Sequence, residues 1–185
     1  NNSYGANGLP VITSTITIQG NGAKIRRQAN VPAFRLMAVS NSGDLTLQDV
    51  TLSGGHGFYY DFGGAIYNSG GTVTIENSTI SGNKADYGGG GVYNSGGAVT
   101  VKSSTISRNR ANVGGGISNG YGGSLAIDAS TVSKNGADFG GGVFNSATLT
   151  ITNTSITGNK AIGFFAQGGG LLNNGDAIIQ NSTLS

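Results

Sequence analysis

The sequence predicts an all-β fold, a single-stranded parallel β-helix (solenoid) of about seven coils with about 25–26 residues per coil. Three observations predict it. Glycine supplies 35 of the 185 residues and proline only 2, which excludes collagen and proline-rich linkers. One motif recurs along most of the chain. Within each copy of the motif, apolar and polar residues alternate with a period of two, which is typical of strands.

The repeat is regular over residues 63–185. Its copies open on a glycine box of the type GG[AG][IV], first GGAI at 63–66, and later carry strings such as NSTISGN. Further boxes begin at Gly89, Gly114, Gly140 and Gly168. Residues 1–62 hold degenerate first coils, with strand segments at 15–18, 44–47 and 50–53. We therefore expect one β-helix domain over 1–185, a fragment of a longer chain, with an inserted loop at 161–167.

Each regular copy contains three short strands, at 65–67, 72–75 and 79–81 in the first copy. They are separated by Gly and Asn, which supply the positive φ that turns need. Three such strands cannot bury an apolar face alone, whereas stacked coils can, because each strand pairs in parallel with its counterpart one copy later. The core is predicted to have three sides, one for each strand of a copy. The first side contributes the inward column Ile66, Val92, Ile117, Val143 and Leu171, and the third contributes Ile80, Ile106, Val132, Ile156 and Leu184. The second side contributes two adjacent columns, Val73, Val99, Leu125 and Leu149, and Ile75, Val101, Ile127 and Ile151.

Two series of asparagines mark the period of the repeat. The first series is spaced 26, 25, 26 and 28 residues apart and comprises Asn68, Asn94, Asn119, Asn145 and Asn173. The second is spaced 26, 26 and 24 residues apart and comprises Asn83, Asn109, Asn135 and Asn159. A residue that recurs at one angular position forms a column, and stacked Asn side chains hydrogen-bond along it. We expect both series to be structural ladders.

Charge and cysteine content exclude several classes of function. Ten basic and eight acidic residues leave a net charge of +2, and only Lys24, Arg26 and Arg27 cluster, so no basic stripe predicts a nucleic-acid partner. No apolar run approaches the roughly 18 residues of a membrane-spanning helix. With no cysteine, the chain has neither disulfides nor thiolate metal sites, which is compatible with secretion. No cofactor is expected.

The glycine box and the NSTISGN string resemble the repeats of right-handed β-helix surface proteins of bacteria. These include polymorphic outer-membrane-protein autotransporter passengers and other secreted proteins of the pectin-lyase-like superfamily. The opening stretch, from Leu9 to Gly22, is also similar to the first coils of such proteins. The resemblance implies a right-handed helix, secretion to the cell surface, a structural or adhesive role and a longer parent chain. Its motifs specify a fold and no reaction.

The alternative is a carbohydrate-binding or carbohydrate-cleaving β-helix. The only histidine, His56, lies in a Gly-His-Gly that resembles the one in polygalacturonases. Their other boxes are absent, and the chemistry requires paired carboxylates as general acid and base. A solvated turn histidine explains His56 better, so no catalytic residue is assigned.

Acidic side chains raise a second question, that of a cation site. Asp61, Asp86 and Asp138 are expected to share one corner of the coils, with Asn112 standing in the remaining coil. Such a column either collects a cation or caps turns, with Lys84 and Arg110 nearby to neutralise it. Turn capping is the preferred interpretation, so no metal site is assigned.

One column of outward positions is aromatic. If Ile66 points inward, Tyr67 points outward, and the same position holds Tyr93, Ser118, Phe144 and Leu172. Tyr67, Tyr93 and Phe144 are therefore the candidate contact surface for a protein partner or a surface glycan, unless the rings only stack on one another. Ranks of Thr and Ser in the strands at 79–81, 105–107, 131–133 and 155–157 offer a third possibility, an ice-binding solenoid.

These observations combine into one functional prediction. We expect a non-enzymatic, extracellular, structural or adhesive β-helix segment of a bacterial surface protein. Neither end of the sequence has an evident polar cap, so unpaired strand edges predict end-to-end stacking of copies into filaments.

Overall fold

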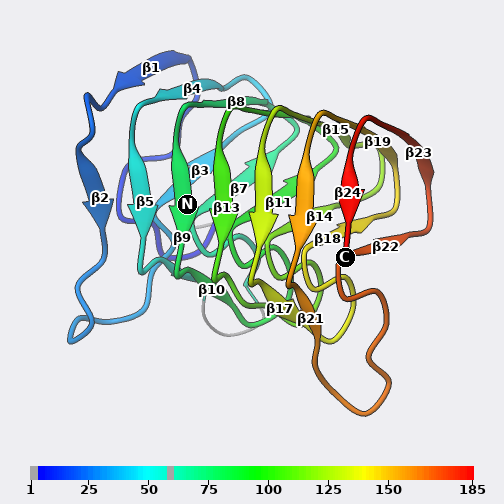
Figure 1. Ribbon diagram of the computed structural model, residues 1–185. Coiled ribbons are helices and arrows are strands. Elements are labelled where there is room, and N and C mark those ends of the chain that lie inside the picture. Colours follow the sequence, from blue (N-terminus) through cyan, green and yellow to red (C-terminus); the bar gives the residue numbers. More distant parts are fainter. Residues whose placement is uncertain (1–3, 58–60) are drawn as a thin grey trace.

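The computed structural model describes residues 4–57 and 61–185, and within them the chain is an all-β solenoid (Figure 1). Three long parallel sheets form its sides. The first sheet contains β1 (Thr15–Gln19), β4 (Asp44–Gln48), β8 (Thr72–Glu76), β12 (Ala98–Lys102), β15 (Ser124–Asp128), β19 (Thr148–Thr152) and β23 (Asp176–Gln180). The second contains β2 (Lys24–Arg26), β5 (Thr51–Ser53), β9 (Thr79–Ser81), β13 (Thr105–Ser107), β16 (Thr131–Ser133), β20 (Ser155–Thr157) and β24 (Thr183–Leu184). The third contains β3 (Met37–Val39), β7 (Ile66–Ser69), β11 (Val92–Ser95), β14 (Ile117–Asn119), β18 (Val143–Asn145) and β22 (Leu171–Asn173).

Two short parallel pairs line the corner that follows the second sheet. They are β6 (His56–Gly57) with β10 (Lys84–Ala85), and β17 (Gly136–Ala137) with β21 (Lys160–Ala161). Residues 162–166 leave this corner as an inserted loop, which was predicted at 161–167 and projects beyond the body of the helix in Figure 1. No helix in the described ranges is long and apolar enough to cross a membrane.

The predicted fold is confirmed, with a smaller number of regular coils. The strands pair in parallel with the expected register, for example Val99 with Val73 on one side and with Leu125 on the other. The third sheet has only six strands in the described part of the chain, so about six turns are complete rather than seven. In the first coil this side is reduced to isolated bridges from Asn7 and Ile12.

Side chains from the three inner faces fill the core. The predicted columns are buried, and Met37, Leu45, Leu47 and Leu52 of the degenerate coils extend them. The last turn differs: Leu171 is only half-buried, and Leu184 is 41% exposed because no further turn covers it in this structure. Burial of such β-branched and leucine side chains stabilises the stack by roughly 25 cal/mol per Å² of apolar surface.

The glycine box allows close contact between turns. The first glycine of each box turns the chain with a left-handed conformation, as at Gly89 with φ 65°. The second cannot carry a side chain, because a Cβ at Gly90 would collide with the carbonyl oxygens of Gly115 and Arg110. Glycine is therefore required here by both backbone conformation and space.

Both asparagine series form continuous hydrogen-bonded ladders. In the first, each Nδ2 donates to the Oδ1 one turn later over 2.7–2.9 Å, from Asn68 to Asn173. In the second, the Oδ1 atoms of Asn109, Asn135 and Asn159 each accept from two groups of the preceding turn, the Asn Nδ2 and the backbone N–H, as Asn109 does from Asn83. Asn109 Nδ2 also donates to the carbonyl of Ile80, so its amide is fully satisfied.

A third ladder, made of hydroxyl groups, joins the first and second sheets. The backbone N–H of Ser78 donates to Ser104 Oγ at 3.0 Å, and Ser104 N–H donates to Ser130 Oγ at 3.0 Å. Each hydroxyl donates in turn to the carbonyl two residues before it, over 2.7 Å at Ser104. Thr154 and Ser182 continue the column. This ladder satisfies backbone groups that the corner would otherwise bury without partners.

Candidate functional site

Aromatic side chains gather on the outer face of the third sheet. Tyr67 of β7 and Tyr93 of β11 are paired in register, and their ring centroids lie 5.7 Å apart. Phe62, just before the first glycine box, lies 4.3 Å from the Tyr93 ring and 4.9 Å from the Tyr87 ring. These distances are those of favourable aromatic pairs. The four rings form one wall, which we call the aromatic wall.

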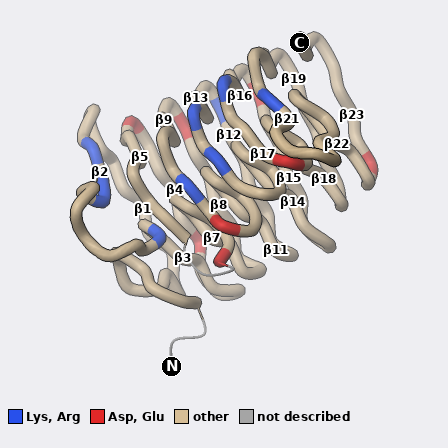
Figure 2. The backbone as a smooth tube through the Cα atoms, turned by 90° about the horizontal axis from the view of Figure 1, so that it is seen from below, with Lys and Arg blue, Asp and Glu red and all other residues tan. Residues whose placement is uncertain are grey.

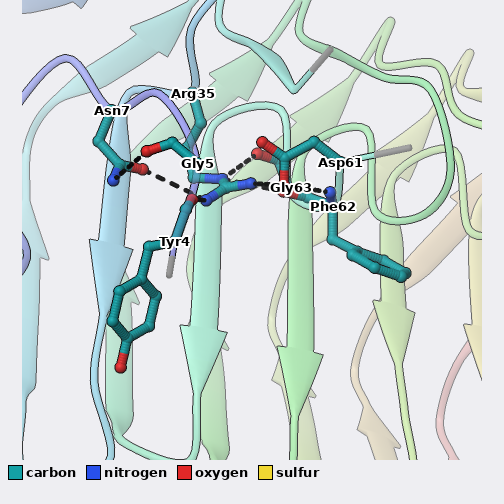
Figure 3. Close-up of polar contacts among 7 residues, drawn as sticks. All are labelled: Tyr4, Gly5, Asn7, Arg35, Asp61, Phe62 and Gly63. Carbon is teal, nitrogen blue, oxygen red and sulfur yellow. Dashed lines mark hydrogen bonds and ion pairs between the residues drawn. The ribbon is translucent and has the colours of Figure 1, made fainter. Parts of the chain in front are cut away.

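A buried arginine anchors the aromatic wall (Figure 3). Arg35 is fully buried, and its guanidinium forms an ion pair with Asp61. Its Nε donates to the carbonyls of Phe62 at 2.9 Å and Gly63 at 3.1 Å, which fixes the backbone that carries the Phe62 ring. The guanidinium also lies over the Tyr67 ring, with Cζ 4.9 Å from the centroid.

The remaining donors of Arg35 hold the start of the chain against the same wall. Its Nη1 donates to the Tyr4 carbonyl and, at 3.2 Å, to Asn7 Oδ1. Burial lowers the pKa of Arg35, and the neighbouring Asp61 carboxylate opposes that change. An arginine remains a cation under such conditions, so the site contains a buried charge pair with all sides of the guanidinium hydrogen-bonded.

Next to the aromatic wall the outer face is hollowed. A groove of about 280 Å³ runs over β11, β14 and β18. It is lined by the aromatic residues Tyr87, Tyr93, Tyr121 and Phe144, by the small residues Gly88, Ser118 and Gly120, and by Val113, Ser146 and Asn174. Across the sheet, Ser118 stands between Tyr93 and Phe144. The groove exists because β14 has Ser118, buried, at the position where β11 has a tyrosine and β18 a phenylalanine.

Two aromatic rings of the groove are open to solvent. Tyr121 is 88% exposed and Tyr87 is 46% exposed. Tyr93 is more enclosed, and burial, together with Tyr67 and Tyr87 nearby, raises the pKa of Tyr93. Its phenol therefore stays protonated at neutral pH and remains a hydrogen-bond donor. The groove thus offers flat apolar faces, phenolic hydroxyls and a small polar rim.

The predicted aromatic column is divided by this groove. Tyr67 and Tyr93 stack in the aromatic wall, whereas Phe144 lies across the groove, beyond Ser118. Sequence reasoning missed Arg35, Phe62, Tyr87 and Tyr121. The Tyr121 signal was available, since its repeat reads ISNGYGGS where the preceding one reads VYNSGGAV, with the tyrosine in the turn.

The acidic residues do not converge on one cation site. Asp61 is bound to Arg35, while Asp86 contacts Lys84 Nζ and His56 Nε2, each at 3.3 Å. Asp138 lies farther along the corner, with its backbone N–H bonded to the Asn112 carbonyl. Among the described residues, no group of three or more His, Cys, Asp or Glu side chains is arranged to hold a metal ion.

The predicted ranks of hydroxyls lie on the second sheet. Thr79, Thr105, Thr131 and Ser155 pair in register, as do Ser81, Ser107, Ser133 and Thr157. Exposed Arg108 and Lys134 directly follow two of these strands. This face is therefore regular but bordered by charge.

Stacked parallel turns with internal hydrogen-bonded ladders define the chain as a parallel β-solenoid. Residues 36–185 match the family model described as the right-handed beta helix region. The match covers most of the chain, and the protein belongs to that family. No curated protein and no solved structure matches it.

Proposed function

We propose that this protein is a non-enzymatic adhesive β-helix segment, displayed on a bacterial cell surface, whose groove between Tyr93 and Phe144 binds a saccharide of a surface glycan. The observation that carries the proposal is the gap at Ser118. It interrupts a column of aromatic rings and leaves a groove that is lined by aromatic and small residues. The ladders and the continuous core hold the turns together, which supports a structural role for the rest of the chain.

The lining of the groove suits a sugar better than a wholly apolar ligand. Tyrosine faces cover the apolar C–H surface of a sugar ring, while phenols and the Ser146 and Asn174 side chains can bond its hydroxyls. The volume of about 280 Å³ is near the lower end of small-ligand pockets, roughly 300–1,000 Å³. One or two sugar units of a longer chain would fit.

Binding without cleavage is proposed because of the charge distribution. Glycoside hydrolysis uses two carboxyl groups on either side of the scissile bond. The described lining of the groove contains no Asp, Glu or His. A reducing-sugar release assay on the bound glycan should therefore give no product, and product formation that Tyr121→Ala abolishes would replace this proposal with a hydrolase.

A glycan microarray followed by calorimetric titration of its strongest oligosaccharide tests the site. Tyr121→Ala removes a ring that is 88% exposed, so it should weaken binding about tenfold while leaving the unfolding midpoint unchanged. Phe164→Ala is the matched control, since Phe164 is 95% exposed but is not part of the groove. Equal affinities of the wild type and Tyr121→Ala, or no glycan bound at millimolar concentration, would exclude this site.

End-to-end association is a second proposed property. Ile179 and Leu184 of the last described turn are both 41% exposed although they continue the inward columns of Ile151 and Ile156, so another turn stacked on them would bury apolar surface. Ile179→Lys should then abolish any concentration-dependent mass increase seen by light scattering. A constant monomer mass for the wild type at millimolar concentration would contradict the proposal.

A further inference from the structure

The loop that follows β21 carries an unusual apolar tip. Phe164 is 95% exposed and Phe165 is 75% exposed, and their rings contact each other edge to face with centroids 5.0 Å apart. Ile162, at the base of the loop, is 39% exposed. Two phenylalanines in water at the end of a projecting loop (Figure 1) gain little from folding, which marks them as a contact surface.

A basic groove lies at the base of the same loop. It encloses about 420 Å³, and its charged lining residues are Arg108, Arg110, Lys134 and Lys160. All four side chains are exposed, and no ion pair to any of them occurs among the described residues. They account for four of the ten basic residues of the chain. The groove is therefore a local concentration of positive charge in a protein with a net charge of only +2.

The helical repeat explains how these cations come together. Arg110 pairs with Gly136, and Gly136 pairs with Lys160, so Arg110 and Lys160 stand two turns apart in one column. Arg108 and Lys134 occupy the parallel column on the other side of the buried asparagine ladder. Gly136 stands in the first column between Arg110 and Lys160, and both Gly136 and Gly158 line the groove without a side chain of their own.

The apolar tip and the basic groove face the same way. Ile162 lines the groove and packs against Gly136, so the loop rises directly from the groove. Figure 1 shows the loop projecting from the lower edge of the helix. Figure 2, seen from below, shows Lys and Arg gathered over successive turns near β13, β16 and β21. Acidic residues also lie on this side: Asp86, which contacts Lys84 and His56, and Asp138, next to Gly163.

We propose that this face docks on the surface of a bilayer that contains anionic phospholipids. The occupant must supply negative charge to Arg108, Arg110, Lys134 and Lys160, and an apolar interior just beneath that charge for Phe164 and Phe165. A bilayer has that arrangement, with phosphates at its surface and acyl chains below them. A soluble polyanion would satisfy the cations and leave both rings in water.

The absence of tryptophan makes a direct test possible. Phe165→Trp introduces the only indole of the chain, and its emission reports burial of the loop tip. Vesicles of phosphatidylglycerol and phosphatidylcholine should shift this emission to the blue, and brominated acyl chains should quench it. Vesicles of phosphatidylcholine alone should have a much smaller effect. Tyr121→Trp, 88% exposed in the other groove, is the matched control and should not shift.

Co-sedimentation with the same vesicles separates the two contributions. Phe164→Ser with Phe165→Ser should lower the partition coefficient about a hundredfold, and these exposed positions tolerate serine without unfolding. Arg108→Gln with Lys134→Gln should lower it roughly thirtyfold, and high salt should reproduce that loss. No emission shift with anionic vesicles would overturn the proposal. So would binding that ignores both serines and is matched by dextran sulfate, which would identify a polyanion groove.

Discussion

At the scale of single residues, the most informative side chain is Arg35. It is buried, holds Asp61, and donates to the carbonyls of Tyr4, Phe62 and Gly63. Removing a cation from water is unfavourable unless it is paired and hydrogen-bonded. Arg35 therefore stabilises the fold only with its complete set of partners, and through Phe62 it determines where the aromatic wall stands.

Asp61→Asn tests this dependence. The amide has nearly the same shape as the carboxylate but carries no charge, so the buried guanidinium loses its counter-ion. We expect the free energy of unfolding in urea to fall by about 3 kcal/mol. Asp138→Asn, which removes a half-exposed carboxylate without a described ion pair, should change it by less than about 0.5 kcal/mol. Equal small effects of both variants would show that the Arg35–Asp61 ion pair contributes nothing to the free energy of unfolding.

The burial of Arg35 could not be predicted from the sequence. It lies in the degenerate coils of residues 1–62, where no regular copy of the repeat gives its angular position, and arginine usually lies at the surface. The regular copies behave differently. There, one inward assignment at Ile66 places every counterpart from Val92 to Val143, because pairing in register carries the same orientation from turn to turn.

At the scale of elements, the ladders arise where one residue recurs in every turn, whereas the groove arises where a single turn departs from its column. A ladder needs the same residue in every turn, so its spacing is visible in the sequence and both asparagine columns could be located. The hydroxyl ladder from Ser78 to Ser182 was not predicted, because serine is common throughout the chain and its column does not stand out. The groove depends on an exception, Ser118 in an aromatic column. What such a gap encloses depends on Tyr121 and Gly88, whose positions only the three-dimensional structure gives.

Interior and terminal rungs of the asparagine ladders should differ in their contribution to stability. Asn109 is an interior rung of the second ladder, and Asn173 is the last rung of the first. Asn109→Ala removes the oxygen that accepts from the buried N–H and Nδ2 of Asn83. We expect a loss of about 2–4 kcal/mol in the free energy of unfolding, since two donors lose their partner. Asn173→Ala, at an exposed last rung, should cost less than about 1 kcal/mol by the same urea titration. Similar losses at both sites would contradict a cooperative ladder.

Filling the gap in the third sheet should abolish ligand binding. Ser118→Phe places a ring between Tyr93 and Phe144 and completes the aromatic column, so the groove disappears. Calorimetric titration should then detect no saccharide binding, while the circular dichroism spectrum stays that of the wild type. A variant that folds normally and still binds would show that the ligand lies elsewhere.

At the scale of the whole molecule, stability is distributed along one axis. Each turn contacts mainly its two neighbours, as in other solenoids, so turns contribute nearly additively to the free energy of unfolding. The length of the stack can therefore change by whole turns without changing the geometry of the rest.

Deletion of residues 89–113 tests this modularity. It places Gly114 (φ 61°) where Gly89 (φ 65°) stood and removes one complete turn. The shortened chain should fold, with an m-value in urea about one-sixth lower, because m scales with the surface exposed on unfolding. Deletion of residues 89–101 removes half a turn and should prevent folding. If the half-turn deletion also gave a folded protein, folding would not depend on keeping the strands of successive turns in register.

The ladders also give the solenoid a direction. Every amide of the first ladder donates toward the C-terminal end, from Asn68 through Asn145. At the start of that ladder, Asn68 Oδ1 has no partner among the described residues, because the preceding turn has Val39 at this position. At the other end Asn173 presents an amide donor. The two ends are therefore chemically unlike, one an acceptor and one a donor. A turn added after Asn173, from this chain or from another copy, can continue the ladder only by presenting an acceptor, whereas the acceptor end at Asn68 is covered by the turn that contains Val39.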